Sequence, residues 1–125
     1  MSSEPTITLA TSDHGNVTLP EPSWCQGHSH HDPLTERADL IHTGTPVDLS
    51  FLGAELFSAQ LVQSPFARPG LHRYGGRIEG VSVHPIGRTL NPTQLYDIAA
   101  RLDAYADHLR ELANQLGAIL AGGER

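Results

Sequence analysis

The residues of this chain that could bind a metal ion are concentrated between Trp24 and His42, in the stretch WCQGHSHHDPLTERADLIH. This stretch contains the only cysteine and half of the eight histidines, namely Cys25, His28, His30, His31 and His42. Thiolate and imidazole are the ligands that zinc prefers in proteins, usually four of them in a tetrahedron. The segment therefore predicts a zinc site.

The spacing of these residues ranks them as ligands. Cys25-x-x-His28 is a chelating pair on a loop, and His42 is a suitable third ligand from a separate segment. The fourth ligand stays open among His30, His31, Asp32 and Asp39, and nickel or copper are weaker candidates for the ion. In the competing interpretation no metal binds, Cys25 is a small buried apolar residue and the histidines are solvated.

A second cluster lies further along the chain, where residues 66–77 interleave arginines with aromatic side chains. We predict a partner-binding role for Arg68, Arg73, Tyr74 and Arg77, because arginine and aromatic rings together suit phosphate contacts and base stacking. The formal charge of −6 opposes a polyanion, so nucleic acid is not the expected partner and an acidic protein is an equal alternative. The competing interpretation is an ordinary surface loop.

An enzymatic function is an alternative rather than the expectation. Cys25 beside His28 or His42 could form a thiolate–imidazolium pair, and a metal with an open position could also act catalytically. No orienting partner or oxyanion site accompanies these residues in the sequence. We therefore expect a non-enzymatic protein-interaction or regulatory accessory module, with a nucleic-acid-associated factor and a small metal- or thiol-dependent enzyme as alternatives.

Length and composition indicate one domain spanning residues 1–125 of this 125-residue chain. A single cysteine excludes an intramolecular disulfide, which favours a reducing cytoplasm. The N-terminal residues lack the pattern of a signal peptide, and no apolar run is long enough to span a membrane. Residues 1–5 are expected to be disordered.

The pattern over residues 6–90 predicts a mostly antiparallel sheet of about five strands. Residues 6–11 and 16–19 alternate polar and apolar side chains around a Gly-containing turn, which is typical of a β-hairpin. The ligand-bearing loop covers residues 20–37 and another loop covers 64–77. Further strands are expected at 38–42, 47–51, 54–63 and 78–84, the last of them extended by residues 86–90 after a bulge.

Residues 91–121 predict one long amphipathic helix, so the fold class is α+β. Apolar residues recur at alternating spacings of three and four, and an alanine flanks them at positions 99, 106 and 113. Such a stripe either covers the sheet or pairs with a second copy as a coiled coil, forming a homodimer. We expect the helix to cover the sheet, and dimerisation is the alternative.

The segment PEPSWCQGHSHHD, followed by DLIHTG, resembles a family of small actinobacterial proteins that is classed only as a domain of unknown function. The shared marks are Trp24, Cys25, His28, His42 and Gly44, together with a C-terminal amphipathic helix that begins at Pro92. The resemblance covers most of the chain from Val17 onward and implies no established activity. It favours Cys25, His28 and His42 over the remaining histidines.

Overall fold

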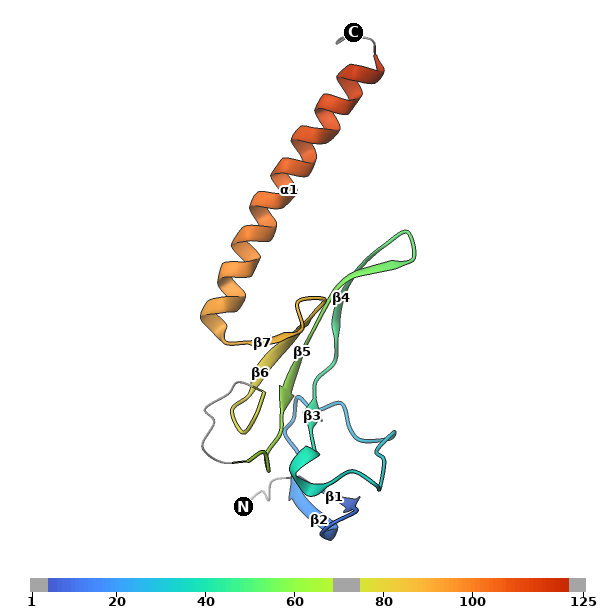
Figure 1. Ribbon diagram of the computed structural model, residues 1–125, viewed down its shortest axis with the longest axis vertical. Helices are drawn as coiled ribbons and strands as arrows, with labels where there is room; N and C mark the ends of the chain where they lie inside the picture. The colour runs from blue at the N-terminus through green and yellow to red at the C-terminus, as the bar shows by residue number, and fades with distance from the viewer. Residues whose placement is uncertain (1–4, 69–74, 122–125) are drawn as a thin grey trace. The chain divides into compact units, whose positions relative to one another are not determined.

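The computed structural model describes residues 5–68 and 75–121, and its chain divides into two compact units, Met1–Asn91 and Pro92–Arg125 (Figure 1). The first unit contains the strands and the second contains the helix, which confirms the predicted α+β class. Its elements are β1 (Thr6–Thr11), β2 (Gly15–Pro20), a 3-10 turn η1 (Arg37–Asp39), β3 (His42–Thr43), β4 (Val47–Phe51), β5 (Ala54–Gln63), β6 (Gly80–His84), β7 (Arg88–Leu90) and α1 (Pro92–Leu120).

Strands β1 and β2 form the predicted hairpin, which is a two-stranded sheet of its own. Ile7 pairs with Leu19 and Leu9 with Val17, so these four apolar side chains share one face. On the other face the hydroxyls of Thr8 and Thr18 lie 2.7 Å apart. The alternation predicted from the sequence therefore produces one apolar and one polar face.

The remaining strands form a five-stranded antiparallel sheet around β5, its longest strand. β3 and β4 pair with successive parts of one edge of β5, β6 pairs with the other edge, and β7 is the outer neighbour of β6. The predicted mostly antiparallel arrangement is confirmed, but the described residues form seven strands in two sheets rather than about five in one, because the hairpin pairs only with itself. Its position relative to α1 is not described, so the covering of the sheet by the helix stays a prediction.

Two predicted strands are wrong in detail. The segment 38–42 is largely not a strand: the N–H of Asp39 donates to the carbonyl of Glu36, and this local bond forms the 3-10 turn. Only His42 and Thr43 join the sheet, by pairing with the end of β5. Residues 86–90 do not extend β6 after a bulge, because Gly87, at φ +72°, turns the chain back and β7 pairs antiparallel with β6.

The buried core beside the candidate site is formed by Leu9, Leu19 and Leu40, with Ile7, Val17 and Phe66 packed against it. The apolar face of the hairpin thus meets the segment that leads into β3. Main-chain bonds support this packing, since the N–H of Ser12 donates to the carbonyl of Thr35 and the N–H of Arg37 donates to Asp13. The ligand-bearing loop is anchored to the hairpin at these points.

Truncation of Leu19 tests whether this small core supports the fold. Leu19 is 2% exposed, so Leu19→Ala is expected to lower the free energy of unfolding by about 2–4 kcal/mol through lost burial and the cavity left behind. Leu34 is 77% exposed, and Leu34→Ala is the matched control, with an expected change below about 0.5 kcal/mol. Urea denaturation followed by Trp24 fluorescence measures both, and equal effects would contradict this assignment of the core.

Helix α1 runs without interruption from Pro92 to Leu120, as predicted. Exposed ion pairs join Asp97 to Arg101 and Asp107 to Arg110 along its surface. Within the described residues, no helix is both long enough and apolar enough to cross a membrane.

Candidate metal centre

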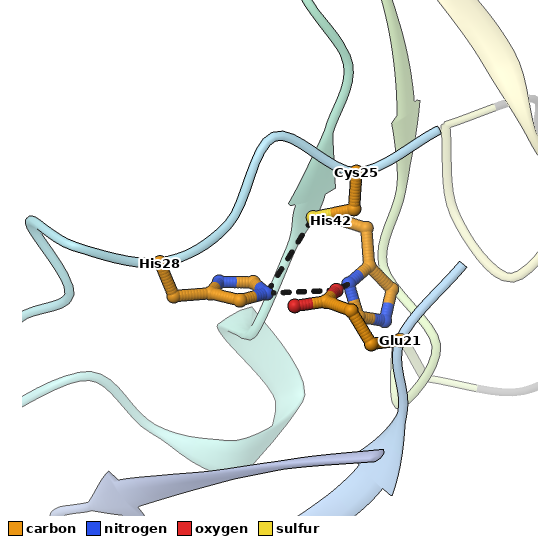
Figure 2. A group of neighbouring side chains, drawn as sticks. All are labelled: Glu21, Cys25, His28 and His42. Atoms are coloured by element: carbon orange, nitrogen blue, oxygen red, sulfur yellow. Dashed lines mark hydrogen bonds and ion pairs between the residues drawn. The ribbon is translucent and has the colours of Figure 1, made fainter. Parts of the chain in front are cut away.

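Four side chains with metal-ligating atoms converge in the first unit: Glu21, Cys25, His28 and His42. Glu21 directly follows β2, Cys25 and His28 lie in the loop after it, and His42 is the first residue of β3. Figure 2 shows the four side chains pointing toward a common centre from these segments. One oxygen, one sulfur and two ring nitrogens all lie within 4.8 Å of one another.

The individual distances are those of a compact ligand set. Glu21 Oε1 lies 2.9 Å from Nδ1 of His42 and 3.2 Å from Nε2 of His28. The same Nε2 of His28 lies 3.6 Å from Sγ of Cys25. In a tetrahedral zinc site, bond lengths of about 2.0–2.3 Å place neighbouring ligand atoms about 3.3–3.7 Å apart. The observed spacing therefore needs only small adjustments to hold one zinc ion.

The ring of His42 supplies a further sign that the site fits a metal. His42 is only 1% exposed, and its Nδ1 is a buried polar atom without a hydrogen-bond partner among the described residues. The nearby oxygen of Glu21 is close enough for an ion pair, but the contact does not have hydrogen-bonding geometry. A buried polar atom without a partner is costly, and a metal ion at the centre would satisfy it.

Backbone geometry brings Cys25 and His28 to the same point. Gly27 has φ +100°, a conformation that glycine adopts without strain, and it turns the chain between the two ligands. Backbone groups of Gly27 and Thr43 hydrogen-bond to the Cys25 side chain and partly oppose the burial that raises the pKa of its thiol. Bonds of this kind stabilise a thiolate, which is the form that binds metal.

The loop is also held against the sheet beside the site. Cys25 pairs with Gly44 in an isolated antiparallel β-bridge, and the N–H of Gly44 donates to the carbonyl of Leu61 on β5. A Cβ at position 44 would lie 3.2 Å from Cβ of Leu61 and 3.4 Å from the carbonyl oxygen of Trp24. Glycine at this position therefore allows the close approach of the Cys25 segment to β5.

His42 is oriented by groups outside the ligand set. The ring of Trp24 meets the His42 ring edge-on, with centroids 6.2 Å apart. The backbone of Pro20 hydrogen-bonds to the His42 imidazole, and the acceptor is the carbonyl because proline has no N–H. A backbone carbonyl that accepts from the second ring nitrogen is the usual support for a metal-binding histidine.

Burial and mutual contacts set the protonation of the site without metal. Burial raises the pKa of Glu21, but hydrogen bonds from Cys25 and His28 outweigh it, so the pKa of this carboxyl lies below its usual value. Burial and the Glu21 carboxylate raise the pKa of the Cys25 thiol. Burial lowers the pKa of His42, although Glu21 partly opposes this effect. At neutral pH the metal-free site therefore holds a carboxylate, a protonated thiol and a neutral His42.

The structure brings together three of the five predicted metal ligands, Cys25, His28 and His42, and places His30 and His31 outside the group. Nε2 of His31 donates to the carbonyl of Ala10, 2.7 Å away, and so anchors the loop to β1. His30 is exposed. Two other candidates for the fourth ligand are also elsewhere: Asp32 accepts from the N–H of Leu34 within a turn, and Asp39 is in the 3-10 turn.

Glu21 is the member of this group that the sequence did not predict. It lies between Pro20 and Pro22, four residues before Cys25. Proline cannot continue a β-ladder, so the strand ends here and the next side chain can turn into the loop. That position was the available sequence sign, but carboxylates are too common in this chain for it to distinguish one of them.

The predicted partner-binding loop is described only in part. Arg73 and Tyr74 lie outside the described residues. Arg77 donates from Nε to the carbonyl of Ala67, so it closes the base of the loop, while Arg68 is exposed. Phe66 is covered by the guanidinium of Arg37, 3.9 Å from the ring centroid. The role of Arg68, Arg73, Tyr74 and Arg77 in partner binding stays a prediction.

A surface pocket of about 590 Å³ borders the ligand set on the side of His28. Its lining includes His30, His31, Asp32 and Asp39, the residues of the loop that do not join the ligand set. These side chains therefore surround a solvent-accessible hollow rather than the metal centre.

Comparison with known proteins assigns the chain to a family. The model of a family described as a domain of unknown function, DUF6907, matches residues 6–118, which cover most of both units and include all four converging side chains. The chain belongs to the DUF6907 family. No curated protein and no solved structure matches it. The resemblance to a domain of unknown function is thus confirmed.

Proposed function

We propose that this DUF6907 protein is a zinc-binding module in which Glu21, Cys25, His28 and His42 hold one structural zinc ion. The observation that carries the proposal is the convergence of four ligand atoms within 4.8 Å from three separate segments. A mixed sulfur, nitrogen and oxygen set is typical of zinc, and harder ions such as magnesium avoid thiolate. The free thiol that the site requires is consistent with a reducing compartment such as the cytoplasm.

Four protein ligands favour a structural rather than a catalytic ion. A catalytic zinc keeps one position for water or substrate, whereas a structural zinc is fully coordinated by the protein. The pocket beside His28 is the feature that an enzymatic alternative would use, but the complete ligand set leaves the ion no position facing it. We therefore propose a non-enzymatic module that acts through protein contacts on a zinc-stabilised surface.

Structural zinc would compensate for the small core. Among the residues that the structure describes, three form the buried cluster beside the site, and small domains with limited cores often depend on a metal. Zinc would join the end of β2, the following loop and β3, so that metal affinity is coupled to folding. In this proposal the ion fixes the loop that carries the remaining histidines.

Calorimetric titration of metal-free protein with zinc tests the proposal. We expect one zinc per chain and release of about one proton at pH 7, because burial keeps the Cys25 thiol protonated until the metal displaces its proton. The neutral His42 has no proton to release. Titrations in buffers with different ionisation enthalpies give the number of protons.

The direction in which pH changes the zinc affinity follows from the same protonation states. Since zinc competes with a proton at Cys25, affinity is expected to rise about tenfold per pH unit around neutrality and to fall as the pH falls. Binding without proton release, or with an affinity independent of pH, would mean that the thiol is not a ligand.

A further inference from the structure

Helix α1 carries a continuous apolar seam that does not depend on the metal site. Its described members are Leu95, Ile98, Leu102, Tyr105, Leu109 and Leu112, at alternating spacings of three and four residues. Leu109 and Leu112 are 49% and 59% exposed, and no seam position holds a charged residue. The pattern continues in the sequence to residue 119, which makes about three and a half heptads, a length typical of a coiled coil.

The lengths of the elements indicate that the sheet alone cannot bury this seam. A helix of 29 residues is about 43 Å long at 1.5 Å per residue. The longest strand, β5, has ten residues and spans about 33 Å, while β6 has five residues and spans about 17 Å. The helix is thus about 10 Å longer than the longest strand, so no strand of the sheet matches the full length of its seam.

The residues that flank the seam fit a second helix of the same sequence. On one side of the seam, positions 99, 106 and 113 are all alanine, and these small side chains allow a second helix to approach closely. The residues on the other side are Arg101, His108 and Gln115. None of these flanking residues is acidic, so pairing with a second copy places no two acidic side chains opposite each other. The charged residues Asp97, Asp103, Asp107, Arg110 and Glu111 lie away from the seam.

We propose that α1 pairs with α1 of a second copy of this chain in an antiparallel two-helix interface. In this arrangement Leu102 packs against Leu112 of the second copy, and Tyr105 packs against Leu109 of the second copy. A parallel pair would instead place Tyr105 against itself and Arg101 against Ala106, without a polar partner. The antiparallel pair places Arg101 opposite Gln115 of the second copy, and opposed helix dipoles add to this preference.

Sedimentation equilibrium of the full chain tests the pairing. We expect a dimer at micromolar concentration that the double variant Leu109→Asp, Leu112→Asp dissociates by at least 100-fold in dimer affinity. The matched control Ala100→Asp, Ala104→Asp adds the same charge on the opposite face and is expected to leave the dimer unchanged. A monomeric wild type, a larger assembly, or equal effects of the two double variants overturns the proposal.

The relative orientation of the two helices is tested by substitutions that each change a single charge. They remove no apolar contact, so they are expected to leave folding intact. Gln115→Glu is expected to tighten the dimer about threefold at low salt by facing Arg101 of the second copy, and Gln115→Arg is expected to weaken it similarly. Asn114→Glu, on the outer face, is the control for net charge. If Gln115→Glu does not tighten the dimer relative to Asn114→Glu, the antiparallel register is wrong. None of these results depends on zinc.

Discussion

Removal of zinc is expected to lower the melting temperature of the strand-containing unit by about 15 °C or more. At free zinc a thousandfold above its dissociation constant, binding stabilises the folded state by about 4 kcal/mol. For a unit of this size each kcal/mol corresponds to about 4–8 °C. The effect is large because the ion joins three segments and satisfies the buried Nδ1 of His42.

Trp24 fluorescence is the appropriate probe of this transition. Trp24 is the only tryptophan, and it contacts the ring of His42. Far-ultraviolet circular dichroism would mix in the melting of α1, which is a separate unit. Melts are compared for protein in buffered free zinc about a thousandfold above its dissociation constant and for protein treated with chelator. His42→Ala is the control, because a variant that cannot hold zinc should melt at one temperature under both conditions. If chelator leaves the wild-type transition unchanged, zinc is not a structural component of this unit.

Substitution of Glu21 is expected to reduce zinc affinity by about 100-fold or more. Glu21→Gln keeps the size of the side chain but removes a negative charge that faces both histidines, at 2.9 and 3.2 Å. Even changes to groups outside a ligand set cost about 10–100-fold in affinity, and loss of a charged ligand should cost at least as much. Competition with a zinc-binding dye gives the dissociation constants.

Two neighbouring substitutions serve as matched controls for Glu21→Gln. Asp32→Asn makes the same chemical change in the same loop, at a carboxylate that accepts a bond within a turn. His30→Ala removes an exposed imidazole two residues from His28. Both are expected to change zinc affinity less than about threefold. If His30→Ala weakens binding as much as His28→Ala, the metal is held by the histidine-rich loop and the proposed ligand set is wrong.

Elements with strong local patterns were predictable from the sequence. The hairpin β1–β2 and strand β5 follow from alternation, and α1 follows from its spacing of three and four. The segment 38–42 was not predictable in this way. Its apolar composition suits a strand, but within the described part of the chain no strand pairs with residues 38–41, and main-chain bonds over three residues form a turn instead.

The metal centre was predictable to the extent that its ligands are chemically rare. Cys25 is unique, and its spacing to His28 points to a chelating pair. His42 stood out because it ends the expected strand at residues 38–42, a segment separate from the Cys25 loop. Among similar side chains the sequence could not choose: His30 and His31 have the same chemistry as His28, but His31 bonds to β1 instead. Glu21 joins the group only because the chain folds back after β2, which is a tertiary effect.

The central claim is that one zinc ion is bound by one sulfur and three lighter ligand atoms. X-ray absorption at the zinc edge, on protein freed of any tag and loaded with one equivalent of zinc, measures this shell directly. The account predicts one sulfur at about 2.3 Å and three nitrogen or oxygen atoms at about 2.0–2.1 Å, with a contribution from two imidazole rings. A shell without sulfur, or a protein that retains no zinc after gel filtration, would contradict it.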